Sequence, residues 1–218
     1  GLDRQTKCNF LKKLRDKLRV VSVKVIDRQI LGATMHLIFL HGVPGVGKRT
    51  IATELSAELG FSFLNFHHLA ALLGPVFGYS SQAFNELRDG TTKILIEQAM
   101  TLPEDGIICS FTYEPSVPLQ NYESFINSAK AVGDIGLFVG LTCDDEELRQ
   151  RVESPERQTL GKVSDFDLLE QSMSEGIFDI PDLPGPSITI NTSGESPEDT
   201  VQNIIAMLPD DMKKGISF

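Results

Sequence analysis

The chain has 218 residues, of which 41% are hydrophobic and 23% charged, and it contains no Trp. This composition predicts one globular domain with a full core, and no apolar run approaches the ~20 residues of a membrane span. No signal peptide is recognisable, and Cys8, Cys109 and Cys143 match neither a disulfide framework nor a metal-ligand pattern, so we expect a cytoplasmic protein.

The net charge of −10 is divided unevenly along the chain. Residues 1–34 hold nine Lys or Arg and three Asp, so they carry +6 and the remainder carries −16. A domain that acidic is unsuited to binding an extended nucleic acid, although a local basic pocket for one nucleotide stays open. We therefore expect a basic N-terminal extension, 1–34, separate from a domain over 35–218.

The extension has an apolar stripe on a basic helical pattern, formed by Phe10, Leu11, Leu14 and Leu18. Such a stripe is typical of a helix that binds a membrane surface or a partner. It also suits a solvated extension beside the domain, since charge-rich helices are mostly surface elements. Both interpretations stay open at this point.

The domain begins with an apolar strand, 35–40, a glycine-rich turn and a helix over 48–59 with Ile51, Ala52, Leu55 and Leu59 on one face. Gly60 is expected to end that helix. A second strand over 61–66 and a short helix over 68–73 follow, and Gly74-Pro75 predicts a break. Ser80 or Ser81 then caps a longer helix to Met100, with an apolar stripe of Phe84, Leu87, Ile94, Leu95 and Ala99.

Further strands are expected over 106–111, 135–142 and 187–191, and Cys109 is expected to be a small core residue in the first of these. Helices are expected over 119–132, from the acidic residues 144–147 onward, over 164–173 and from Ser196 to about Leu208. Five short apolar strands alternating with helices predict an α/β fold: a five-stranded parallel sheet flanked by helices in three layers. Ligands of such sheets bind at the carboxyl ends of the strands.

Residues 42–50 carry the most specific motif. The glycines allow backbone N–H groups to surround a phosphate, the following helix N-terminus adds donors, and Lys48 adds a cation. Arg49 stands where a Ser or Thr usually binds magnesium, and the hydroxyl comes one residue later, at Thr50. We therefore expect a nucleotide-phosphate site, with Thr50 as the candidate Mg²⁺ ligand, made of Gly42, Val43, Pro44, Gly45, Val46, Gly47, Lys48, Arg49 and Thr50.

This loop resembles that of nucleoside monophosphate kinases and related small-molecule P-loop kinases, in the form Gly-x-Pro-Gly-x-Gly-Lys-x-Thr. The resemblance covers about residues 35–208, and it extends to shikimate-kinase-like and chloramphenicol-phosphotransferase-like proteins through residues 64–69, 107–115 and 147–162. It implies a P-loop NTPase fold, the cofactors ATP and Mg²⁺, and adenine recognition by backbone near 192–197.

A lid over about 151–165 is expected beside these phosphates. Arg151 and Arg157 are its candidate catalytic cations, because arginine suits bidentate phosphate recognition and a closing lid excludes water. The same arginines also fit a solvated helix face on which Glu147 pairs with Arg151 at helical spacing. Lys48 completes the candidate catalytic set of cations.

The acceptor side is less specific. His67 and His68 are expected at the end of the second strand, where one of them would contact the acceptor, because neighbours in an extended chain point opposite ways. P-loop kinases often place an Asp after the second or third strand, but this chain has Leu72 at one such position. Glu114 is the nearby carboxylate and the candidate catalytic acid, although it also fits an exposed loop.

The sequence thus predicts an ATP- and Mg²⁺-dependent kinase that phosphorylates a small hydroxylated metabolite, nucleoside or nucleotide. The alternative is a catalytically impaired nucleotide-binding regulatory protein whose basic arm engages a partner. The sequence identifies neither the acceptor nor the oligomeric state.

Overall fold

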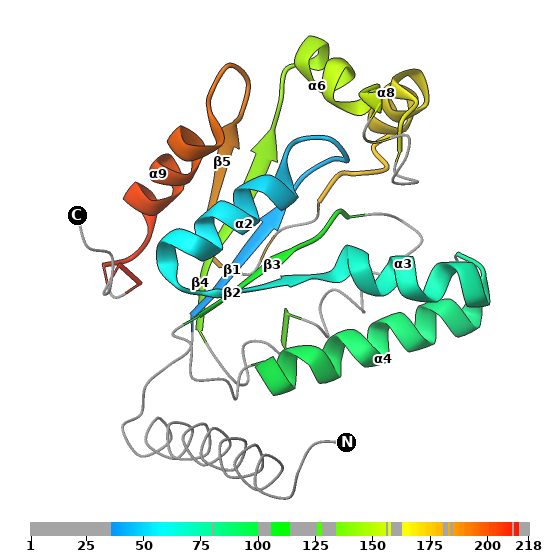
Figure 1. Cartoon of the computed structure of the whole chain (residues 1–218), viewed down its shortest axis with the longest axis horizontal. Coiled ribbons are helices and arrows are strands. Elements are labelled where there is room, and N and C mark those ends of the chain that lie inside the picture. The colour runs from blue at the N-terminus through cyan, green and yellow to red at the C-terminus, as the bar shows by residue number, and fades with distance from the viewer. Residues whose placement is uncertain are drawn as a thin grey trace, which may run out of the picture.

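The protein is described by a computed structural model (Figure 1) over residues 36–79, 81–99, 106–113, 126–127, 134–155, 157, 163–180, 183, 185–210 and 212–213. Its centre is a five-stranded sheet in the order β2-β3-β1-β4-β5, and all four neighbouring pairs are parallel. The strands are β1 (His36–His41), β2 (Ser62–Asn65), β3 (Gly106–Ser110), β4 (Asp134–Thr142) and β5 (Ser187–Asn191). The predicted parallel α/β fold is confirmed.

The described helices are α2 (Lys48–Leu59), α3 (Phe66–Phe77), α4 (Gln82–Ala99), α6 (Asp145–Val152), α8 (Phe166–Ser174) and α9 (Pro197–Met207). Several begin and end where the sequence predicts. The hydroxyl of Ser81 accepts from the N–H of Phe84, and that of Ser196 accepts from the N–H of Asp199. Gly60 ends α2 in the left-handed conformation that favours glycine.

Alternate residues of β1 serve two separate cores. Ile38 and Leu40 pack with α2 and α9 in the larger one, whereas Leu37 and Phe39 pack on the opposite face with Ile96 of α4. Cys109 lies in the second core and is fully buried, as predicted. Helices therefore cover both faces of the sheet, which explains why its central strands are continuously apolar.

Helix α3 differs from its prediction. It starts at Phe66, so His67 and His68 lie in its first turn and do not end the second strand. It also continues through Gly74 and Pro75 to Phe77, where a break was expected. The predicted strand was too long because the Asn65 side chain accepts a hydrogen bond from the N–H of His67, which caps a helix at that point.

The apolar stripe predicted for α4 is wrong in part. Phe84 is buried and Ala99 packs on the second core, but Leu87, Ile94 and Leu95 are exposed. Ile96 is buried in their place. The predicted helix over 119–132 lies outside the described residues except for 126–127, which are helical.

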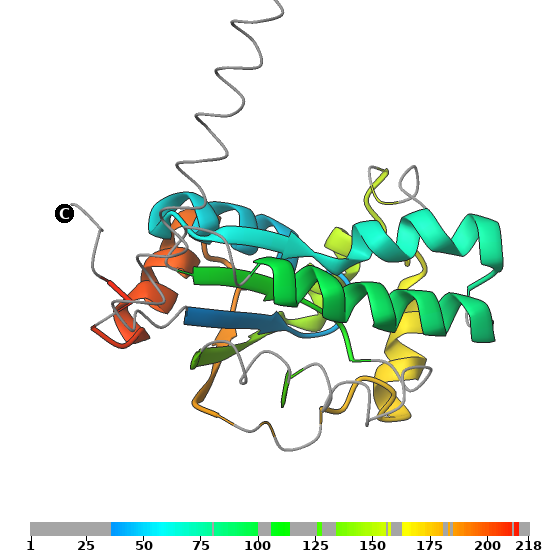
Figure 2. The ribbon, with the colours of Figure 1, turned by 90° about the horizontal axis from the view of Figure 1, so that it is seen from below.

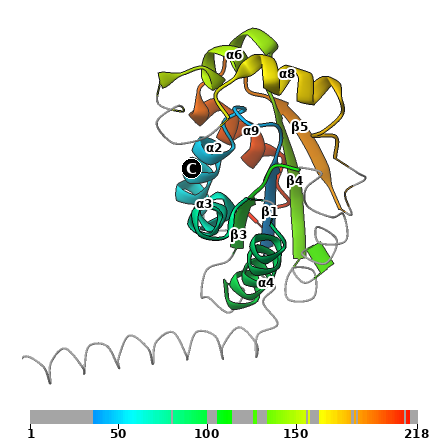
Figure 3. The same ribbon diagram turned by 90° about the vertical axis from the view of Figure 1, so that its right-hand side faces the viewer.

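The carboxyl ends of the strands meet two groups of helices. α3 and α4 pack side by side as an arm that extends past the strand ends (Figure 1). α4 runs back along the sheet toward the start of β3 (Figure 2). Viewed along the arm, α6 and α8 lie on the opposite side of the strand ends from α4 (Figure 3). The loop after β1 lies between these two groups. No helix within the described ranges is both long and apolar enough to span a bilayer.

Candidate nucleotide site

The turn between β1 and α2 has backbone that only glycine adopts without strain. Gly42, Gly45 and Gly47 have φ values of 136°, 105° and 95°. A Cβ on Gly42 would lie 2.3 Å from the carbonyl oxygen of Leu141, and one on Gly45 would lie 2.8 Å from Cδ1 of Leu148. Gly47 also caps α2 without a side chain. The turn thus presents bare backbone at a helix N-terminus, which suits an anion.

Lys48 turns back over this loop. Its Nζ donates to the carbonyl oxygens of Gly42 at 2.8 Å and Val43 at 2.9 Å. Burial, followed by the nearby charge of Arg157, lowers the pKa of Lys48 to about 7. Among the residues that the structure describes, no carboxylate pairs with this ammonium group, and an incoming phosphate would supply the opposite charge.

Arg49 and Thr50 follow in the first turn of α2, and both residues are exposed. The carbonyl oxygen of Arg49 accepts from the hydroxyl of Thr53. The candidate metal role of Thr50 stays a prediction. Within the described ranges there is no group of three or more His, Cys, Asp or Glu that would form a protein-only metal site.

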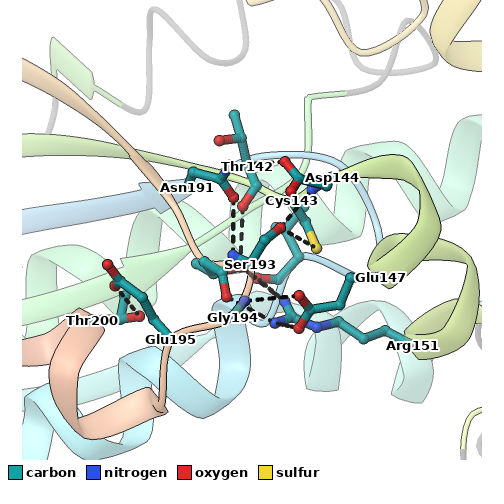
Figure 4. Close-up of polar contacts among 12 residues, drawn as sticks. Thr142, Cys143, Asp144, Glu147, Arg151, Asn191, Ser193, Gly194, Glu195 and Thr200 are labelled. Carbon is teal, nitrogen blue, oxygen red and sulfur yellow. Dashed lines mark hydrogen bonds and ion pairs between the residues drawn. The ribbon is translucent and has the colours of Figure 1, made fainter.

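Arg151 of α6 joins the loop to the segment after β5 (Figure 4). Its Nη1 donates to the hydroxyl of Thr192 at 2.8 Å and to the carbonyl oxygen of Val46 at 3.4 Å. Its Nη2 donates to the carbonyl oxygen of Thr192 and to the carboxylate of Glu147. The other oxygen of Glu147 accepts from the N–H of Gly194 at 2.9 Å. Three segments distant in sequence are therefore connected by one guanidinium and one carboxylate.

The charge of Arg157 acts on Lys48. Its Nε and Nη2 both donate to the carbonyl oxygen of Val163, at 3.1 and 3.0 Å. Burial lowers the pKa of Arg157, and its charge in turn contributes to the lowered pKa of Lys48. The structure thus places Lys48 and Arg151 in contact with the loop and Arg157 near enough to affect Lys48, and their catalytic roles stay predictions.

Two of the three predicted acceptor-side residues are described by the structure. His67 and His68 are exposed in the first turn of α3. Because they lie on a helix, successive side chains diverge by roughly 100° and do not point opposite ways as in a strand. Glu114 lies outside the described residues, so its predicted role is not tested.

Two residues of the site were missed from the sequence. His41 ends β1, with its ring 5.9 Å from that of Phe111 and against Gly140, where a Cβ would lie 2.9 Å from Cε1. Burial and then Lys48 lower the pKa of His41 to about 4, which keeps it neutral near pH 7. A polar residue ending an apolar strand was the available signal. Thr192, directly after β5, was assigned to adenine recognition only as part of a segment, and its contact with the loop was not foreseen.

Comparison with known proteins places this loop in a family. A sequence profile described as "AAA domain" matches residues 38–164, which is more than half of the chain. The chain belongs to this AAA domain family. A protein of Pyrococcus abyssi (strain GE5 / Orsay), described as "Putative adenylate kinase", is 25% identical to this AAA domain protein over 182 residues, 84% of this chain and 89% of that protein.

Solved structures support the fold of this AAA domain. A gluconokinase from Sinorhizobium meliloti 1021 matches with a TM-score of 0.54 and 14% identity, over 78% of this chain and 90% of its own. A shikimate kinase from Bacteroides thetaiotaomicron matches with a TM-score of 0.52 and 21% identity, over 79% of this chain and 98% of its own. The predicted P-loop kinase fold is confirmed.

Proposed function

We propose that this protein is a kinase that transfers the γ-phosphoryl group of ATP to a small-molecule acceptor. The loop at residues 42–48 carries the proposal: it combines positive-φ glycines, a helix N-terminus and a buried lysine whose ammonium group contacts the backbone carbonyls of Gly42 and Val43. A polyphosphate fits this cradle because side chains are excluded from the turn at Gly42 and Gly45, where a Cβ would clash with Leu141 and Leu148. The kinase domain is proposed to be 35–218, with a lid over about 151–165.

In this proposal Lys48 leaves the carbonyl oxygens of Gly42 and Val43 and pairs with the β- and γ-phosphates. Arg151 holds the loop against the Thr192–Pro197 segment, where the nucleoside end is expected. Arg157 stabilises charge on the transferred group. Mg²⁺, when bound, would neutralise phosphate oxygens and retain waters, with the hydroxyl of Thr50 as its protein ligand.

The acceptor oxygen forms a bond to the γ-phosphorus as the bond from that phosphorus to the bridging oxygen breaks, and ADP leaves. The acceptor proton passes to Glu114, His67, His68 or the transferred phosphate. Transfer of this kind depends on positioning and charge neutralisation more than on covalent chemistry by the protein. The cations around the loop are suited to that task.

A screen of nucleoside monophosphates, nucleosides and sugar acids with γ-labelled ATP tests the proposal. We expect labelled product with at least one acceptor, and a loss of about 100-fold or more in Lys48→Gln, because a charge at the reacting phosphate is removed. Lys93→Gln, an exposed residue of α4, is the matched control for charge.

One observation favours the impaired nucleotide-binding protein as a second candidate. Within the described ranges, β1, β2 and β3 end in His41, Asn65 and Ser110, so none of these three strands ends in a carboxylate. Tight binding of an ATP analogue with no transfer to any acceptor would refute the kinase and support this second candidate.

A further inference from the structure

Three apolar side chains on α4 lie open to solvent along one side of the helix. Leu87, Ile94 and Leu95 are 40%, 58% and 38% exposed, and they are spaced by seven and eight positions, so they share a side. Ile96, nine positions after Leu87 and therefore on the opposite side, is buried in the sheet core. Leu87, Ile94 and Leu95, called here the exposed α4 stripe, thus form a second apolar side of α4 that the described residues leave uncovered.

This stripe lies toward the end of the domain at which residues 1–35 are attached. α4 runs back along the sheet toward the start of β3 (Figure 2), and His36, the first residue of β1, pairs with Gly106, the first residue of β3. Ile96 also belongs to the same core as Leu37, the second residue of β1. The chain before His36 therefore joins the sheet at the end to which the second half of α4 returns.

The extension carries a matching pattern. Its apolar side chains, Phe10, Leu11, Leu14 and Leu18, are called here the extension stripe, and a helix over these residues would rise ~12 Å. The exposed α4 stripe covers eight positions as well, so the two stripes have the same length. Packing one against the other would remove apolar surface of both from water, which is favourable.

Charge and chain length favour the domain of the same chain as the partner. The extension carries +6 and residues 35–218 carry −16, so the two parts attract each other. An anionic membrane would attract the extension but repel the domain that follows it. Leu18 and His36 are 18 positions apart, a distance of up to ~60 Å, whereas α4 is ~27 Å long. The extension can therefore reach the α4 stripe at an effective concentration of roughly millimolar.

We propose that the extension stripe packs on the exposed α4 stripe of the same chain. This assigns an intramolecular partner to the basic N-terminal extension and a cover to the uncovered side of α4. The phosphate loop follows the carboxyl end of β1, whereas the extension precedes its amino end. The docking surface is therefore separate from the nucleotide site, and the inference does not depend on the proposed kinase function.

Fluorescence tests this contact in the full chain. The protein contains no Trp, so Leu14→Trp places a single Trp within the extension stripe. We expect its acrylamide quenching constant to be at least about twofold lower than in the same protein with Ile94→Asp, because a charge within the apolar contact is costly and releases the extension. Leu168→Asp, which changes an exposed leucine of α8 (60% exposed), is the matched control and should leave the quenching unchanged.

The same experiment distinguishes the other partners. It is repeated after about tenfold dilution of the protein, and with vesicles of phosphatidylcholine and phosphatidylserine. Protection of the Trp that is lost on dilution would indicate a second copy of the chain, because only an intermolecular contact follows mass action. A Trp protected only by vesicles would indicate a membrane surface. Either result overturns the inference, as does equal quenching with and without Ile94→Asp.

A second measurement needs no substitution in the domain. A photo-reactive p-benzoylphenylalanine replaces Phe10, and the cross-linked peptides are identified by mass spectrometry. We expect cross-links within one chain to the segment of α4 around Ile94, and cross-links that miss α4 would overturn the inference. Thermal unfolding checks that Ile94→Asp is folded. ADP affinity should be the same in Ile94→Asp and wild type, since the docking surface lies apart from the loop.

Discussion

The pKa of Lys48 leads to a prediction about nucleotide affinity. That pKa is about 7, because the ammonium group is buried and feels the charge of Arg157, while its printed hydrogen bonds go to the carbonyl oxygens of Gly42 and Val43. A polyphosphate supplies opposite charge and raises the pKa of Lys48, so binding takes up a proton wherever the free lysine is neutral. We expect affinity for ADP to fall as the pH rises through 7.

The size of the effect follows from the free-state pKa. If the bound lysine stays charged, the apparent Kd is inversely proportional to the charged fraction of the unbound lysine, which gives about a 15-fold increase from pH 7 to pH 8.5. At pH 7 about half a proton is taken up per nucleotide. Titration calorimetry in buffers of different ionisation enthalpy measures both quantities, and ADP is chosen so that turnover does not interfere.

Variants test whether Lys48 causes the pH dependence of ADP affinity and the proton uptake. Lys48→Gln should bind more weakly at every pH and lose the proton uptake, whereas Lys93→Gln should behave as wild type. Arg157→Gln should move the window to higher pH, because its charge is one cause of the lowered pKa. A Kd that is constant from pH 7 to pH 8.5, together with no proton uptake in wild type, would refute the reasoning.

The same pKa predicts how stability varies with pH in the absence of nucleotide. The folded pKa of Lys48 lies below its unfolded value, so between about pH 7 and pH 10.5 the unfolded chain binds more protons. The lysine's contribution to the free energy of unfolding therefore rises with pH in that window and is lost as the pH falls through 7. Lys48→Met should remove this slope in chemical denaturation and stabilise the protein at pH 7.

Three further predictions concern neighbouring contacts. Gly140→Ala should lower the free energy of unfolding by about 1–3 kcal/mol through a clash with the His41 ring, and His41→Ala in the same chain should recover much of the loss, as measured by urea unfolding. Ser196→Ala should cost about 1 kcal/mol by the same method, because α9 loses its cap. Thr192→Val should weaken ADP binding several-fold with a smaller effect on stability, because it removes the hydroxyl that bonds both the guanidinium of Arg151 and the carbonyl oxygen of Val46 in the loop. Equal ADP binding by calorimetry would contradict this.

The fold was predictable because its signals are local and agree with one another. From His36 to Leu59, the hydrophobic pattern, the turn residues and the helix-ending glycine all predict the same strand, turn and helix. Ser196 followed by Pro197 likewise predicts the start of the last helix. Alternation of strands and helices then leaves little choice but a parallel sheet. None of these features depends on residues far apart in the sequence.

The arm was predicted less well because packing decided its details. Pro75 lies near the end of α3, and Gly74 before it receives the ring of Tyr79, whose Cζ would lie 2.2 Å from a Cβ there. The Gly74-Pro75 pair, which usually indicates a turn, lies inside a helix here, and its glycine leaves room for the ring of Tyr79. In α4 the apolar stripe was assigned partly to the wrong face, because Ile96 packs in the core whereas Ile94, two residues earlier and therefore on another side of the helix, is exposed.

The contacts within the site could not have been foreseen in the same way. Arg151 was selected as a cation of the lid, but its hydrogen bonds to Val46 and Thr192 join positions 105 and 41 residues away. Only the sheet order brings these segments together. His41 was overlooked because the strand pattern was taken to end at Leu40, one residue before the structure ends β1.

The two lid arginines are held in different ways, and the difference suggests a division of labour. Arg151 is bound by a carboxylate, a hydroxyl and two backbone carbonyls, so moving it would break the link between the loop and the segment after β5. Arg157 is bound by one carbonyl and, within the described ranges, has no carboxylate partner, while its charge raises the cost of keeping Lys48 protonated. A polyphosphate would relieve that cost for both cations at once. We therefore expect Arg151 to stay in place when nucleotide binds and Arg157 to be the arginine that moves onto the phosphates.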